Sequence, residues 1–222
     1  MSFYLGLILK ELVGIVSDRT ILDPATGGKD VSRPRFSKVN EHTFFIPAGL
    51  MKFAEPAYNC LREIFGDLPL DLRKTCDYET AFSEKVGSQY REIKSRAIGY
   101  LGERGIDIQY ARFDSLLAGI SSAGVLYIIN LSDTKQFSFE AFTRPFTSLT
   151  IGAESEKARK GLNGSMSQFM AAVAKEPLIR QRALVKKFLL AVVDFVSKYS
   201  DVVSVEGDLI LIEKGGSEIY TF

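Results

Sequence analysis

The order of the predicted secondary-structure elements is the feature that most constrains the fold of this chain. Apolar runs bounded by turn signals predict strands in consecutive groups, and two pairs of amphipathic helices separate these groups. Strands that follow one another directly pair as antiparallel neighbours, whereas a parallel sheet needs a helix between successive strands. The order therefore argues against a doubly wound parallel sheet.

The predicted strands form four groups along the chain. They are a hairpin at 3–9 and 13–17, a second hairpin at 36–39 and 43–47, a central set within 108–120, at 125–131 and at 136–142, and a final hairpin at 209–212 and 218–222. The stretch 23–34 between the first two hairpins is rich in Gly, Asp, Pro and Ser and is predicted as a loop. Lys214-Gly215-Gly216-Ser217 is a typical turn sequence for the final hairpin.

Apolar residues at helical spacing predict the two helix pairs. The first helix begins near Pro56 and stops at Gly66, and the second carries a stripe from Phe82 to Leu101 before Gly102. The second pair is expected at 155–174 and 177–199. The chain is predicted as a single α+β domain, 1–222. Because two helix pairs need two apolar surfaces, its expected architecture is a four-layer α/β/β/α sandwich of two antiparallel sheets.

Composition and charge exclude several function classes. The net charge is +1, and no basic patch interleaved with aromatic residues supports nucleic-acid binding. No run approaches the roughly 20 apolar residues of a membrane span, and the N-terminal segment has no features of a signal peptide. These observations predict a cytoplasmic protein that binds neither nucleic acid nor membrane.

The histidine and cysteine content limits the catalytic chemistry. His42 is the single histidine, so a multi-histidine metal site is excluded and a Ser-His-Asp triad would depend on one residue in a predicted turn. Cys60 and Cys76 fit neither a metal-ligand spacing nor a disulfide framework. We expect His42 to be a solvated hairpin residue and Cys60 to pack as a small apolar side chain.

Short segments spread over the chain carry a resemblance to a known family. They are Ser2 with Gly6, Ser17-Asp18-Arg19, Pro47-Ala48-Gly49-Leu50, Asp201-Val202-Val203-Ser204, and Asp208-Leu209-Ile210-Leu211-Ile212. In their order, their spacing and the order of the surrounding elements they resemble proteasome subunits and the related bacterial proteasome-like proteins. These belong to the N-terminal-nucleophile (Ntn) hydrolase superfamily.

The resemblance implies a catalytic set that needs neither a metal nor a cofactor. Removal of Met1 would leave Ser2 as nucleophile, and its own α-amine, with an ordinary pKa of about 8, as the general base. Asp18 and Arg35 would supply electrostatic support, and the N–H of Gly49 would form the oxyanion hole. Asp201 and Ser204 would hydrogen-bond around the amine.

The chain departs from the family pattern at four places. Arg35 stands where the family has its essential lysine, and the guanidinium keeps the positive charge but cannot shuttle a proton. Ala153 occupies the position of a family serine. Val205 and Glu206 replace two glycines expected after Ser204. The nucleophile itself is serine rather than threonine.

The same resemblance implies a substrate pocket. Its lining residues are Ile21, Arg33, Pro47 and Met51, together with Phe53 or Ala54. Arg33 would favour an acidic or carboxylate-bearing group next to the scissile bond.

Three readings of function remain open at the level of sequence. The first is an Ntn peptidase acting on peptides, and the second is an Ntn enzyme acting on a small non-peptide amide. The third is a proteasome-like subunit without activity that serves as an assembly or binding module. All three predict a homo-oligomer, either a ring or stacked rings, because family members assemble through their helices and loops.

Overall fold

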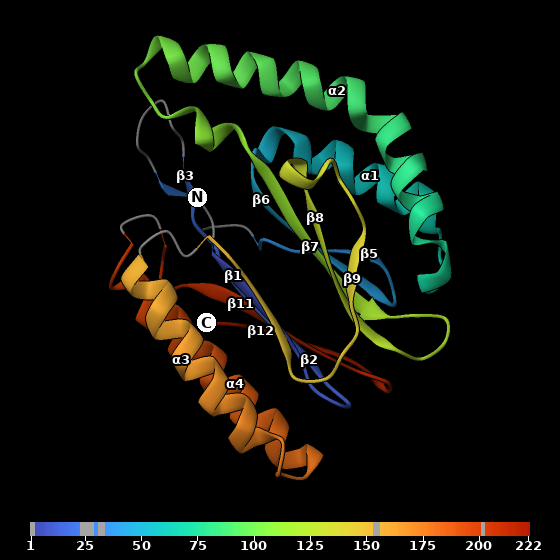
Figure 1. Cartoon of the computed structure of the whole chain (residues 1–222), viewed down its shortest axis with the longest axis vertical. Helices are drawn as coiled ribbons and strands as arrows, with labels where there is room; N and C mark the ends of the chain where they lie inside the picture. The colour runs from blue at the N-terminus through green and yellow to red at the C-terminus, as the bar shows by residue number, and fades with distance from the viewer. Residues whose placement is uncertain (1–2, 23–28, 31–33, 153–155, 201–202) are drawn as a thin grey trace. The chain divides into compact units, whose positions relative to one another are not determined.

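The computed structural model describes residues 3–22, 29–30, 34–152, 156–200 and 203–222 (Figure 1). The chain divides into two compact units. The first unit comprises Met1–Asp23, Lys29–Arg35 and Thr143–Phe222, and the second comprises Pro24–Gly28 and Phe36–Phe142. Within the described residues there are two five-stranded antiparallel sheets and four α-helices, which confirms the predicted α+β class.

The first unit is built on the sheet with strand order β10-β1-β2-β11-β12. Its strands are β1 (Tyr4–Ile8), β2 (Val13–Asp18), β10 (Thr147–Ile151), β11 (Gly207–Glu213) and β12 (Gly216–Thr221). A separate two-stranded ribbon joins β3 (Ile21–Leu22) to β4 (Lys29–Asp30). The first and last predicted hairpins are thus confirmed, and they are joined side by side through β2 and β11.

Helices α3 (Glu156–Val173) and α4 (Leu178–Ser197) belong to the first unit, and α4 packs on β2 and β11. The fully buried side chains of the helix-facing core of this unit are Leu, Val and Met apart from Phe3, and the other aromatic side chains lie only at its half-buried edge. Gly14 lets α4 approach β2 closely, because a Cβ at this position would lie 2.6 Å from Val185 Cγ1 and 3.0 Å from Leu189 Cδ1. Pro177 precedes the first residue of α4 as its N-cap, as its restricted φ favours.

The second unit is built on the sheet with strand order β5-β6-β7-β8-β9. Its strands are β5 (Ser37–Asn40), β6 (Thr43–Gly49), β7 (Phe113–Ile120), β8 (Leu126–Ser132) and β9 (Glu140–Phe142). Its helices are α1 (Ala54–Phe65) and α2 (Thr75–Glu103), with 3-10 turns η1 (Met51–Phe53), η2 (Leu72–Lys74), η3 (Ile108–Ala111) and η4 (Asp133–Lys135). Gly66, with φ +57°, ends α1 as the sequence predicts.

Aromatic rings fill the space between the helices and the sheet of the second unit. Phe53 lies at the centre, with its ring centroid 4.8 Å from that of Tyr90 and 4.9 Å from that of Phe113. Phe82 and Phe137 complete the group around it. Edge-to-face contacts dominate, which is the geometry that the ring quadrupoles prefer.

The prediction of strands is wrong in three places. The expected strand at 136–142 is reduced to β9, because Gln136 and Phe137 adopt left-handed φ values of 53° and 60° and turn the chain after η4. Strand β4, Lys29–Asp30, lies in the stretch 23–34 that is predicted as a loop. Strand β10 was not expected, and it extends the sheet of the first unit beside β1.

Candidate functional site

Asp18 is the last residue of β2, and its carboxylate is completely buried. One carboxylate oxygen, Oδ1, accepts the backbone N–H of Phe3 at 2.7 Å, and the other accepts the N–H of Thr20 at 3.1 Å. The Asp18 backbone N–H in turn donates to the Phe3 carbonyl at 3.0 Å. Asp18 therefore binds both backbone polar groups of the residue that follows Ser2 in the chain, while Ser2 itself lies outside the described residues.

Arg35 supplies the positive charge that acts on the Asp18 carboxylate. Its side chain is only 4% exposed. Burial raises the pKa of the Asp18 carboxyl, and the Phe3 N–H, the charge of Arg35 and Thr20 act against this rise. Burial also lowers the pKa of Arg35, and the charge of Asp18 opposes it. Asp18 and Arg35 are therefore two buried residues of opposite charge, each of which favours the charged form of the other.

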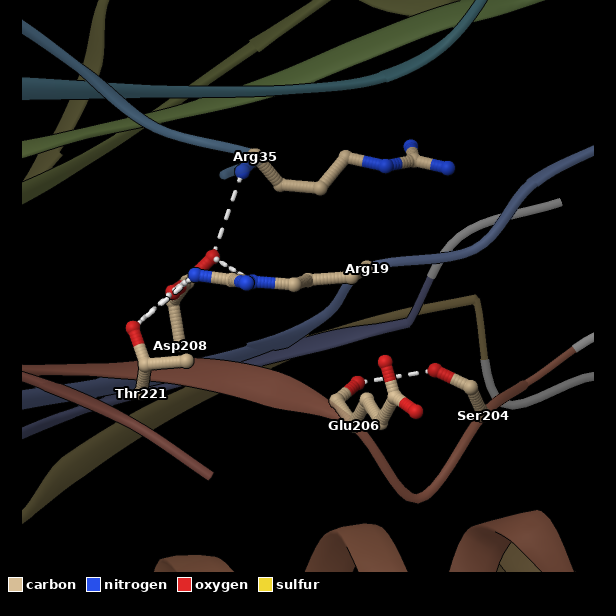
Figure 2. A network of polar contacts seen from close by, with 6 residues as sticks. All are labelled: Arg19, Arg35, Ser204, Glu206, Asp208 and Thr221. Carbon is tan, nitrogen blue, oxygen red and sulfur yellow. Dashed lines mark hydrogen bonds and ion pairs between the residues drawn. The ribbon is translucent and has the colours of Figure 1, made fainter. Parts of the chain in front are cut away.

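A second buried carboxylate, Asp208, lies at the same end of the sheet, because its neighbour Gly207 pairs with Asp18 across β11 and β2. Figure 2 shows the contacts of Asp208. Its side chain is 1% exposed and forms a two-bond ion pair with Arg19, from Nε at 3.0 Å and from Nη2 at 2.5 Å. The Thr221 hydroxyl donates to it at 3.1 Å, and the backbone N–H of Arg35 donates to it at 3.3 Å. The sequence reasoning treated this residue only as the start of an apolar strand.

A signal for Asp208 was present in the sequence. A carboxylate placed directly before four consecutive apolar residues is expected to be buried with them, and a buried carboxylate needs a cationic or N–H partner. Arg19, next to the predicted catalytic Asp18, was a cation without an assigned partner. The signal could not identify the pair, because the two residues are 189 positions apart.

Ser204 lies on the loop that leads into β11. Its hydroxyl donates to the backbone carbonyl of Glu206 at 2.8 Å, and the same carbonyl accepts the N–H of Arg19 at 3.1 Å (Figure 2). The loop is thus closed locally and attached to the residue that follows Asp18. Asp201 lies outside the described residues.

The predicted oxyanion residue, Gly49, belongs to the second unit, where it ends β6 with φ +76°. A Cβ at this position would lie 2.1 Å from the carbonyl oxygen of Arg112, which accepts the N–H of Leu50 at 2.7 Å. Only glycine fits this backbone conformation and this close approach. The structure thus gives Gly49 a backbone role whether or not its N–H binds an oxyanion.

The predicted pocket residues are divided between the two units. Pro47 is buried in β6 of the second unit, and Met51 is the first residue of η1 in the same unit. Ile21 begins β3 in the first unit. Arg33 lies outside the described residues.

His42 and Cys60 have the surroundings that the sequence predicts. His42 is exposed in the turn between β5 and β6, and its backbone N–H donates to Asn40 Oδ1 at 2.9 Å. Cys60 is buried in the core of the second unit, and this burial raises the pKa of its thiol to about 11. Among the described residues, no group of three or more His, Cys, Asp or Glu side chains is arranged to hold a metal ion.

Comparison of the chain with protein-family models and with curated proteins finds no match. In the part of the chain that the structure describes, none of the helices has both the length and the apolar character that crossing a membrane requires.

Proposed function

We propose that this protein is an Ntn amidohydrolase of the proteasome-like type that cleaves a peptide or a small amide, with Ser2 as its nucleophile after removal of Met1. The observation that carries the proposal is the 2.7 Å hydrogen bond from the Phe3 N–H to the buried carboxylate of Asp18, next to the charge of Arg35. It attaches the chain immediately after Ser2 to a buried pair of opposite charges, as a fixed N-terminal nucleophile requires.

The chemistry assigns a separate role to each group. The α-amine of Ser2 takes the hydroxyl proton, directly or through a water, as the oxygen attacks the amide carbonyl. Arg35 remains protonated at ordinary pH, so it acts as a fixed positive charge that holds down the pKa of the amine. Asp18 holds Arg35 and Phe3, and the N–H of Gly49 binds the developing oxyanion.

The proposal includes the four-layer α/β/β/α sandwich that the sequence predicts. Each unit supplies what two of these layers need, a five-stranded antiparallel sheet and a pair of helices.

A second candidate function is an inactive proteasome-like subunit that assembles as a homo-oligomer or binds a partner. The observation in its favour is the hydrogen bond from the Ser204 hydroxyl to the Glu206 carbonyl at 2.8 Å. A hydroxyl that donates to the backbone of its own loop has no further proton to donate to a catalytic amine. Arg35, in place of the family lysine, favours the same candidate.

Mass spectrometry of the N-terminal peptide, before and after treatment with an epoxyketone, separates the two candidates. This electrophile captures a hydroxyl and the adjacent α-amine together. We expect loss of Met1 and a single adduct on Ser2, and no adduct on the matched Ser2→Ala variant, which can still lose Met1. A retained Met1, or a processed Ser2 that does not react, would support the inactive subunit.

The preference of the pocket is tested in the same protein. If Arg33 faces the substrate, amides with an acidic group next to the scissile bond are cleaved faster than apolar ones. Equal turnover of the two kinds of substrate would exclude this role of Arg33.

A further inference from the structure

The carboxylate of Asp208 connects four segments of the first unit. It is 1% exposed, and both of its oxygens accept two hydrogen bonds each: Oδ2 from Arg19 Nε and the Arg35 backbone N–H, Oδ1 from Arg19 Nη2 and the Thr221 hydroxyl. These donors come from the end of β2, from the segment before β5 and from β12 (Figure 2). A buried carboxylate with this many donors is a rigid attachment point.

Two of these contacts act on the Asp18–Arg35 pair. The N–H that binds Asp208 is the backbone donor of Arg35, the residue whose guanidinium interacts with the charge of Asp18. Arg19 directly follows Asp18, and its guanidinium is held by the same carboxylate. Asp208 thereby holds the backbone of Arg35 and the side chain of Arg19, the residue next to Asp18.

We propose that Asp208 is a positioning residue that holds the guanidinium of Arg35 against Asp18. The inference rests on the proposed function only where it links this pair to Ser2, because the pairing itself can be measured without any reaction. Asp208 also neutralises Arg19, so that the positive charge acting on Asp18 is that of Arg35.

The direction in which the pKa of Asp18 changes when Asp208 is removed distinguishes positioning from a direct charge effect. If Asp208 acted on Asp18 only as a neighbouring negative charge, its removal would lower the pKa of Asp18. If Asp208 positions Arg35, its removal lets the guanidinium move away from Asp18, and the pKa of Asp18 rises. The two explanations thus predict opposite results for the same substitution.

The experiment is a titration of the aspartate carboxyl carbons by NMR, in full-length protein carrying carbon-13 at aspartate, with Asp18→Asn used to assign the resonance. We expect Asp208→Ala to raise the pKa of Asp18 by about 1 pH unit, the size of shift that loss of a nearby opposite charge produces. An unchanged or lowered pKa overturns the inference. If Asp208→Ala does not fold, Asp208→Asn takes its place, since an amide offers a single oxygen to donors that now use two.

A double-mutant cycle shows whether the effect passes through Arg35. In an Arg35→Met background, Asp208→Ala should no longer raise the pKa of Asp18. A rise of the same size in that background would overturn the positioning role. Asp133→Asn is the matched control, because Asp133 is also 1% exposed and paired to a cation, Lys94 at 2.6 Å, in the second unit. We expect it to leave the pKa of Asp18 unchanged.

Epoxyketone labelling of the same samples separates failure of this inference from failure of the proposed function. If Asp208→Ala raises the pKa of Asp18 but Ser2 of the wild type is not labelled, the positioning role is retained and the proposed enzymatic function is excluded. If Ser2 is labelled but Asp208→Ala does not raise the pKa of Asp18, the enzymatic function is retained and the positioning role is excluded.

Discussion

The two units have the same plan, a five-stranded antiparallel sheet with a pair of helices, but they fill it with different side chains. The helix-facing core of the second unit is a set of interlocking rings around Phe53. The corresponding core of the first unit is nearly all aliphatic. The first unit instead contains Asp18, Arg35 and Asp208, three buried charged residues at one end of its sheet.

The difference indicates how each unit specifies its structure. Aromatic rings have preferred relative orientations, so the second unit is specified by the shape of its core. Leu, Val and Met can repack with little change in energy, so the first unit depends more on its buried charges, each of which needs a particular partner. The candidate site lies among these charges.

Removal of the central ring should have the largest effect. We expect Phe53→Ala to destabilise the second unit by about 4 kcal/mol, because the space left among Tyr90, Phe82 and Phe113 cannot close. Leu189→Ala in α4 should cost the first unit less, about 3 kcal/mol. Urea unfolding followed by hydrogen exchange in each unit measures both losses. Equal losses would contradict the view that the aromatic core is less able to repack than the aliphatic core.

Removal of one partner of an ion pair should be next in size. Arg19→Met leaves Asp208 without its cation in the first unit, and we expect a loss of about 3 kcal/mol. Lys94→Met removes the cation of Asp133 in the second unit, but Lys94 is 34% exposed and Asp133 keeps the hydrogen bond from the Tyr90 hydroxyl, so about 1 kcal/mol is expected. Thermal unfolding of the two variants tests this order. If Lys94→Met were the more destabilising variant, buried charge would contribute at least as much to the stability of the second unit as to that of the first.

Alanine substitution at two glycines that pack closely against neighbouring atoms, Gly49 and Gly14, should give a smaller difference in stability loss. Gly49→Ala places a Cβ against the backbone oxygen of Arg112 at a positive φ, and we expect a loss of about 2 kcal/mol. The nearest atoms to the Cβ of Gly14→Ala belong to the side chains of Val185, Leu189 and Leu7, which can move, so about 1 kcal/mol is expected. Denaturant midpoints compare the two, and a larger loss at Gly14 would mean that the aliphatic core is the more rigid.

The smallest effect concerns pH. Burial raises the pKa of Asp18 above its ordinary value of 3.8, so the folded state holds this proton more tightly than the unfolded state does. Stability therefore falls as the pH rises from about 4 through the folded pKa, and it is constant above it. Relative to wild type, Asp18→Asn should gain stability over that interval. Asp114→Asn in the second unit should show the same sign, since burial also raises the pKa of Asp114.

Much of the fold could be predicted because its signals are local. Turn residues separate the strands of each hairpin, and the apolar stripe of α4 recurs with helical spacing. Strand β10 could not be predicted, since three of its five residues are Thr or Ser and its partner β1 lies more than a hundred residues earlier. The left-handed Gln136 and Phe137 break a pattern that otherwise indicates a strand.

The candidate site was predicted only as far as a resemblance reached. The resemblance implied electrostatic support from Asp18 and Arg35, and both residues are buried in the first unit, where the charge of each favours the charged form of the other. It gave no reason to consider Asp208, whose role depends on contacts between segments far apart in the sequence. Ser2, Asp201 and Arg33 lie outside the described residues, so their roles stay predictions.

The division of the chain between the units has a consequence for how the protein folds. The second unit, apart from Pro24–Gly28, comes from the single stretch Phe36–Phe142, whereas the first joins N-terminal residues to Thr143–Phe222. During synthesis the second unit can fold as soon as its stretch has left the ribosome, but β1 and β2 must wait for β11. Because distant segments meet slowly, assembly of the first unit should limit the folding rate. The charges of the candidate site would then come together in the last step.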